Sequence, residues 1–95
     1  MAKITIVGNP ATVALPDTAE NVIVFDPSLS QGVPSPTTAI IEIVTGTVNF
    51  NTQGQPAANG ASYTTAGTKF PLTFRFTDGI SVKATTAGDS FKISF

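Results

Sequence analysis

Hydrophobic and polar residues alternate through the last part of the chain, from Lys69 to Phe95. The alternating hydrophobic positions are Phe70, Leu72, Phe74 and Phe76, then Ile80, Val82 and Ala84, and then Phe91, Ile93 and Phe95. A period of two places each of these sets on one face of a β-strand. Because these positions hold five of the seven Phe residues in the chain, they predict a wall of the hydrophobic core.

Turn residues predict how these strands are connected. The segment 77–79, Thr-Asp-Gly, predicts a three-residue turn with Gly79 in the left-handed conformation, because this turn keeps both sets of hydrophobic residues on one face. Such a turn would pair Phe76 with Ile80, and a second turn around Gly88 would pair the next two strands. The sequence therefore predicts an antiparallel meander. The alternative is that the last strand crosses to another sheet.

The rest of the chain contains six further segments with strand composition, separated by Pro, Gly, Asn and Asp. These segments are 3–7, 11–15, 22–25, 38–44, 47–51 and 63–65. No window shows the 3.6-residue periodicity and capping residues of a helix. The pattern predicts a single all-β domain over residues 1–95. Its expected architecture is a two-sheet antiparallel β-sandwich, jelly-roll-like, with about eight short strands and no helix; an immunoglobulin-like sandwich is the alternative.

Two of the predicted strands are hydrophobic on both faces. The segment 22–25 contains no polar residue, and the segment 40–44 contains only Glu42. A strand of a two-sheet sandwich buries one face only, so the second face needs another explanation. In one interpretation, the ends of the strand pass under a loop or a few aliphatic side chains stay exposed. In the other, a second subunit covers the face. The second interpretation assigns an oligomer interface to Val22, Ile23, Phe25, Ile40, Glu42 and Val44.

The low charge of the chain favours assembly over binding of nucleic acid. Charged residues make up 12% of the sequence and the net charge is −1, whereas roughly 25% is usual. The five basic residues are scattered, so a nucleic-acid-binding stripe is not expected. No apolar run approaches the roughly 20 residues of a membrane-spanning helix, so a membrane partner is not expected either.

Candidate chemistry is sparse. The sequence has no His and no Cys, which excludes Ser-His-Asp and Cys-His catalysis and metal sites built on imidazole or thiolate. No phosphate-binding glycine motif occurs. Most of the acidic residues lie beside Pro or Gly or in turns, where the side chain of Asp commonly forms hydrogen bonds with the local backbone. The sequence therefore predicts no enzyme, no catalytic residue, no cofactor and no metal; calcium held by Asp78, Asp89 and loop carbonyls is the alternative.

The loop 52–62 and the residue that follows it form the best candidate for a ligand site. Its polar and aromatic candidates are Gln53, Gln55, Asn59 and Tyr63. An exposed aromatic ring beside polar groups is typical of glycan binding. The other interpretation is that Tyr63 packs its ring on the rim of the core with its hydroxyl in water. For Glu42, a pair with Arg75 or a lysine across the sheet and a solvated edge position are both open.

Several general features are shared with one group of proteins. The chain starts Met-Ala-Lys, its strands are rich in Thr, Ala, Gly and Asn, it lacks Cys and His, and it ends in the strand 89–95. In these features the whole chain resembles the small all-β structural proteins of tailed bacteriophage virions, namely capsid decoration proteins and head-fibre or tail-tip modules.

The resemblance implies a non-enzymatic virion component that decorates or stabilises the capsid or forms a surface projection. It would be made in the host cytoplasm, assemble as a homo-oligomer, with a homotrimer as the expected form, and bind the major capsid or fibre protein at the virion surface. The alternative function is a small carbohydrate-binding or adhesin module, whose partner would be a glycan.

Overall fold

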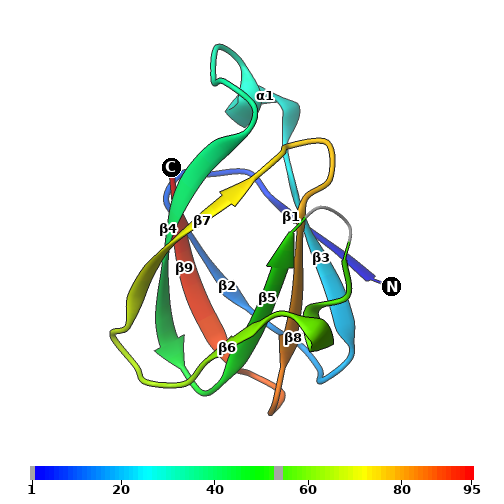
Figure 1. Cartoon of the computed structure of the whole chain (residues 1–95), viewed down its shortest axis with the longest axis vertical. Coiled ribbons are helices and arrows are strands. Elements are labelled where there is room, and N and C mark those ends of the chain that lie inside the picture. The colour runs from blue at the N-terminus through cyan, green and yellow to red at the C-terminus, as the bar shows by residue number, and fades with distance from the viewer. Residues whose placement is uncertain (1, 53–54) are drawn as a thin grey trace.

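The computed structural model describes residues 2–52 and 55–95, which form two β-sheets packed face to face (Figure 1). Sheet A contains, in spatial order, β1 (Ala2–Ile6), β3 (Glu20–Phe25), β8 (Ile80–Ala84), β5 (Val48–Thr52) and β6 (Ala61–Tyr63). Sheet B contains, in spatial order, β2 (Ala11–Ala14), β9 (Ser90–Ser94), β4 (Thr37–Thr45) and β7 (Lys69–Phe74). The predicted all-β sandwich is confirmed.

Strands β2 to β9 are arranged as one long hairpin that is folded into two sheets. Its two arms pair antiparallel as β2 with β9, β3 with β8, β4 with β7, and β5 with β6. Each step along an arm passes from one sheet to the other, and the pairs β4–β9 and β5–β8 complete the sheets. This is the topology of an eight-stranded jelly roll, as predicted. The additional strand β1 extends sheet A beside β3 and runs parallel to it, so sheet A is not wholly antiparallel.

The predicted meander is wrong, because consecutive strands of the C-terminal region lie in opposite sheets. Strand β7 belongs to sheet B, β8 to sheet A and β9 to sheet B. The left-handed conformation predicted for Gly79 is confirmed, with a φ of 71°. The predicted pairing of Phe76 with Ile80 is wrong, because β7 ends at Phe74 and Phe76 lies within the turn. The Gly79 N–H donates to the Arg75 carbonyl at 3.0 Å and closes this turn. It forms a corner between the sheets rather than a hairpin, since each strand pairs with the opposite arm of the long hairpin instead of with its neighbour in sequence.

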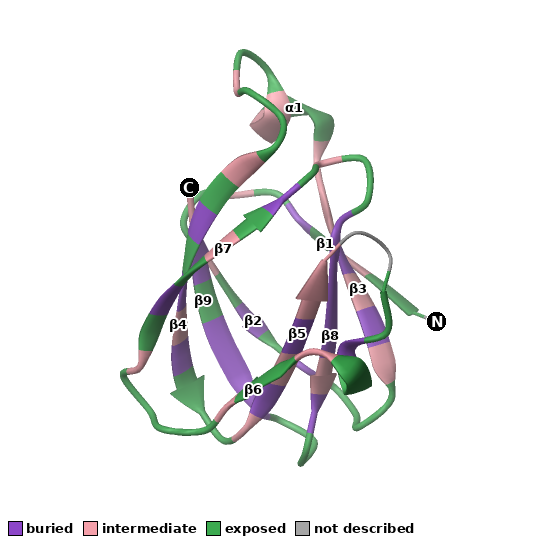
Figure 2. Cartoon of the chain, in the orientation of Figure 1, coloured by how far each residue is buried: buried purple, intermediate pink, exposed green. Residues whose placement is uncertain are grey.

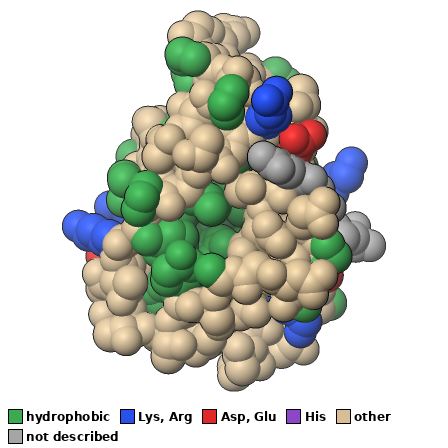
Figure 3. All heavy atoms as spheres, in the orientation of Figure 1, with side chains coloured by type: hydrophobic (Ala, Val, Ile, Leu, Met, Phe, Trp, Pro, Cys, Tyr) green, Lys and Arg blue, Asp and Glu red, His purple; other side chains and the backbone are tan. Residues whose placement is uncertain are grey.

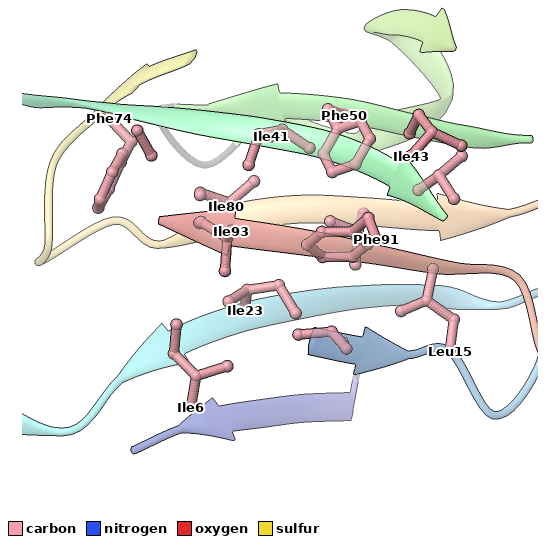
Figure 4. Close-up of a cluster of buried hydrophobic side chains, with 14 of the residues drawn as sticks. Ile6, Leu15, Ile23, Ile41, Ile43, Phe50, Phe74, Ile80, Phe91 and Ile93 are labelled. Atoms are coloured by element: carbon pink, nitrogen blue, oxygen red, sulfur yellow. The ribbon is translucent and has the colours of Figure 1, made fainter. Parts of the chain in front are cut away.

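The hydrophobic core lies between the sheets, where the alternating residues of both sheets meet (Figures 2 and 4). Completely buried side chains include Ile23 and Ile80 from sheet A and Ile41, Phe91 and Ile93 from sheet B. The inward and outward alternation was correctly predicted, because a pleated strand places every second side chain on the same face whatever its partner strand is.

Two short helical turns lie in the long connections of this all-β fold. The single turn α1 (Pro27–Ser30) follows Asp26, whose carboxylate accepts a hydrogen bond from the Ser28 N–H at 3.0 Å. Asp at the N-cap and Pro at the first helical position favour this start. The turn projects beyond the end of the sandwich (Figure 1). A 3₁₀ turn, η1 (Ala57–Asn59), lies in the second long connection.

Candidate functional site

The six residues predicted as an interface are divided between two faces by the pleat of their strands. Ile23 is completely buried in the core of its own chain. Phe25 also points inward, and its ring stacks on Phe74 with the ring centres 4.8 Å apart. Phe76 and Phe95 pack edge-on against the same ring. Ile23 is therefore a core residue, and its assignment to an interface between subunits was wrong. Phe25 is partly buried and packs against the core.

Part of the outer face of sheet A, over β5 and β8, is covered by the chain itself. Residues 55–60 fold across β5 and β8, and Ala57 becomes completely buried. The Ala57 N–H donates to the carboxylate of Glu20 on β3. Val22 also points to this side and is half-buried; its Cγ1 lies 3.1 Å from the position that a Cβ would take on Gly79. Residues 55–60 thus cover β5 and β8, whereas the outward Val22 and Val24 of β3 are half-buried.

The outer face of sheet B is different, because hydrophobic residues remain exposed there. Ile40 is 45% exposed and Val44 is 43% exposed, both on the outward side of β4. Glu42 lies between them, and its neighbours across the sheet are Lys69 on β7 and Lys92 on β9. A shallow depression of about 120 Å³ lies over this region. Glu42 is thus placed between lysines, whereas Arg75 is not its neighbour in the register.

Tyr63 lies at the open side of the sandwich, where the edge strands β6 and β7 are not hydrogen-bonded to each other. Its ring stacks on Phe70 of β7, with the ring centres 3.6 Å apart and the planes within 6°. Figure 3 shows a hollow lined by hydrophobic side chains in this part of the molecule, between β7 and strands β5 and β6. Tyr63 therefore joins the two sheets at the rim of the core.

The candidate ligand residues do not form a site around that ring. Phe70 covers one face of the Tyr63 ring and Phe50 packs edge-on against it, so the half-buried ring belongs to the rim of the core. Gln55 and Asn59 are exposed on the connection that crosses sheet A. Gln53 lies outside the described residues.

The two acidic residues weighed as calcium ligands are separated by the length of a strand. Asp78 precedes β8 and Asp89 follows it. The Asp89 carboxylate is buried and accepts hydrogen bonds from the N–H groups of Thr86 at 3.0 Å and Thr47 at 3.3 Å. Asp89 therefore ties the turn before β5 to the turn before β9. Within the described residues, no group of three His, Cys, Asp or Glu side chains is placed to hold a metal ion.

A polar pocket on the outer side of sheet A was not predicted from the sequence. It has a volume of about 420 Å³ and is lined by Thr18, Asn49, Ala58, Lys83, Ala84 and Thr85. Its residues come from the β2–β3 connection, β5, η1, β8 and the turn after β8. No sequence motif links these segments, because only the pairing of β5 with β8 and the return of residues 55–60 bring them together.

Comparisons with known proteins give no family for this chain. A scan against protein-family models found no match, and neither did searches of curated proteins and of solved structures. The helices found in residues 2–52 and 55–95 are too short to cross a membrane.

Proposed function

We propose that this protein is a non-enzymatic structural module that self-associates through the outer face of sheet B. The observation that carries this proposal is the exposure of Ile40 and Val44 on β4, at 45% and 43%. Each of these side chains would contribute about 1.5–3 kcal/mol if a partner buried it completely, and roughly half of that from its present exposure. On sheet A, residues 55–60 cover β5 and β8, and the outward Val22 and Val24 of β3 are half-buried. Val7, directly after β1, is 73% exposed and lies outside the strands.

The charges of this face suit contact between copies of the same chain. Glu42 lies between Lys69 and Lys92 in the register, so the face carries both signs of charge close together. Identical faces can then place Glu42 of one copy against a lysine of another. Such pairs fix the orientation of the subunits, whereas the apolar residues supply most of the affinity.

The wider role that we propose is a virion surface component, in which a homotrimer decorates a capsid or forms part of a projection. The jelly roll is frequent in viral capsid proteins and also in lectins, so the fold agrees with this role without selecting it. The resemblance of the sequence to virion proteins supports it further. The partner would be a major capsid or fibre protein.

The test of self-association is the mass in solution, measured by light scattering after size exclusion at several concentrations. We expect a mass near three times 9.8 kDa for the wild type and a monomer for Ile40→Lys and Val44→Lys. Thr5→Lys is the matched control, because Thr5 is an exposed residue of β1 in sheet A and the added charge is the same. A wild-type protein that is monomeric at every concentration contradicts the proposal.

The virion role has a separate test. Cryo-electron microscopy of purified particles should show this chain in repeated copies on their surface. Particles that assemble normally and contain none of the chain would contradict the virion role. This result would not bear on the proposal of self-association.

A further inference from the structure

The polar pocket on sheet A has the size and the construction of a ligand site. Its volume of about 420 Å³ falls within the range of about 300–1,000 Å³ that is typical of small-molecule sites. Asn49 and Lys83 are direct neighbours on β5 and β8 and form its floor. Thr18, Ala58 and Thr85 line its sides.

The wall that contains Ala58 is held in place by several hydrogen bonds. The preceding Ala57 N–H donates to Glu20, and the Pro56 carbonyl accepts from the Asn51 side chain at 3.1 Å. At the end of the wall, Gly60 lies so close to β5 that an added Cβ would be 1.9 Å from the Phe50 carbonyl oxygen. The pocket is therefore formed in the unliganded chain, and a ligand would not have to order this wall.

The polar side chains of the floor are oriented and still have hydrogen-bonding capacity. Lys83 donates one N–H to the Thr18 carbonyl at 2.9 Å, which leaves two further donors on its ammonium group. The side-chain oxygen of Asn49 accepts from the Ser62 hydroxyl at 2.7 Å, so its NH₂ group is the part that is available. The hydroxyls of Thr18 and Thr85 add groups that both donate and accept.

From this arrangement we infer that the pocket binds a neutral saccharide unit. A sugar supplies many hydroxyl and ring oxygens, which suit adjacent ammonium and amide donors together with two threonine hydroxyls. Glu20 is the register neighbour of Lys83 on β3, so its negative charge offsets that of the ammonium and gives an anionic ligand little advantage. The small side chain of Ala58 leaves room for the ring.

This site is independent of the proposed self-association, because it lies on sheet A and the proposed interface lies on sheet B. The test is an NMR titration of ¹⁵N-labelled protein with glucose, galactose, mannose, N-acetylglucosamine and glucuronic acid. We expect saturable amide shifts at Asn49, Ala58, Lys83 and Thr85 with at least one of the neutral sugars. Because the lining contains no aromatic ring, affinity in the millimolar range is expected.

Variants separate this site from general surface binding. Lys83→Met keeps the side-chain stem and should weaken binding about tenfold, the loss expected for removing a charged hydrogen-bond donor. Lys92→Met makes the same change on an exposed residue of sheet B and should leave binding unchanged. Asn49→Ala provides a second test if Lys83→Met does not fold.

Three outcomes would overturn the inference. The first is that no neutral sugar gives saturable shifts. The second is that the shifts map away from the pocket, or that Lys83→Met and Asn49→Ala both bind like the wild type. The third is that glucuronic acid alone binds, which would show that the ligand is selected by charge.

Discussion

The two outer faces of the sandwich differ in the exposure of their hydrophobic strand residues. Residues 22–25 of β3 and 40–44 of β4 are hydrophobic on both sides. A segment of the chain covers part of sheet A, over β5 and β8, and the outward residues of β3 are half-buried. Residues 55–60 return across β5 and β8 and bury Ala57 completely, whereas Ile40 and Val44 remain exposed on sheet B. The comparison shows that a two-sided strand does not by itself indicate a subunit interface. What decides is whether a connection returns over that sheet.

The position of the two long connections explains the difference. The connection from β5 to β6 contains η1, which lies against β5 and β8. The connection from β3 to β4 contains α1, which projects beyond the end of the sandwich and covers neither outer face (Figure 1). Within residues 2–52 and 55–95, no long connection lies over β4, although the segment 40–44 is nearly as hydrophobic as the segment 22–25.

The largest effect is expected from placing a lysine at matched isoleucines on the two sides of the pleat. Ile23→Lys buries an unpaired charge in the core, which costs at least about 4 kcal/mol and is enough to unfold a domain of marginal stability. Ile40→Lys should remain folded and lose only self-association. Thermal unfolding followed by circular dichroism, together with light scattering, distinguishes the two results. Folded Ile23→Lys protein would contradict the assignment of this residue to the core.

The next largest effect tests the cover of sheet A. In Gly60→Ala the new Cβ would lie 1.9 Å from the Phe50 carbonyl oxygen and 2.9 Å from the Asn51 Cβ, so the covering segment must move away from β5. We expect a loss of about 2–4 kcal/mol in the free energy of unfolding, measured by chemical denaturation. Gly8→Ala is the control, because its nearest contact is an ordinary 3.6 Å and it should change stability little. Equal stability of Gly60→Ala and wild type would show that the cover is not tightly packed.

A smaller effect is expected from the hydrogen bond that anchors the cover. Glu20→Ala removes the acceptor of the buried Ala57 N–H and should cost about 1–3 kcal/mol. Hydrogen exchange at the Ala57 amide should accelerate, because the segment opens more often. Glu42→Ala is the matched change on sheet B and should leave hydrogen exchange at the Ala57 amide unchanged, because Glu42 lies far from the covering segment. If exchange at Ala57 is unchanged in Glu20→Ala, the cover is held by other contacts.

The smallest effect is expected from Asp26, the N-cap of α1, in the connection from β3 to β4. The hydrogen bond from the Ser28 backbone N–H holds the pKa of the Asp26 carboxyl below its usual 3.8. The ionised form is thus favoured by folding, so this contribution is present above about pH 3.8 and is lost as the pH falls through the lower pKa of the folded state. Asp26→Asn keeps a capping side chain but removes the titration. Denaturation over this pH range should show a small acid-dependent loss in the wild type that Asp26→Asn lacks, and identical profiles would contradict it.

Much of the fold could be predicted because strand patterns are local. The inward set of β8 and β9 follows directly from alternation, and the turn at Gly79 follows from the need for a residue that tolerates a positive φ. The partners of β7, β8 and β9 could not be predicted from the same residues. A turn that reverses the chain leads equally well to a hairpin or to a corner between sheets, and the choice depends on contacts with strands far away in sequence.

The candidate sites were less predictable than the fold. Phe25 was placed at an interface because the segment 22–25 has no polar residue, but it packs against Phe74, Phe76 and Phe95, which lie 49 or more positions away from it in sequence. The pocket at Asn49 and Lys83 had no sequence signal, since both residues alone are typical of a solvated sheet surface.

By itself, the sequence determined the all-β class, most strand positions and the inward side of each strand, because the period of two and the residues at turns act within a few neighbours. Tertiary structure alone decided the pairing of the two arms, the cover on sheet A and the bare outer face of sheet B. These three features depend on contacts between segments that are distant in sequence. The packing and backbone hydrogen bonds of the whole chain determine which arrangement is most stable. Local composition is the same in either arrangement and does not distinguish them.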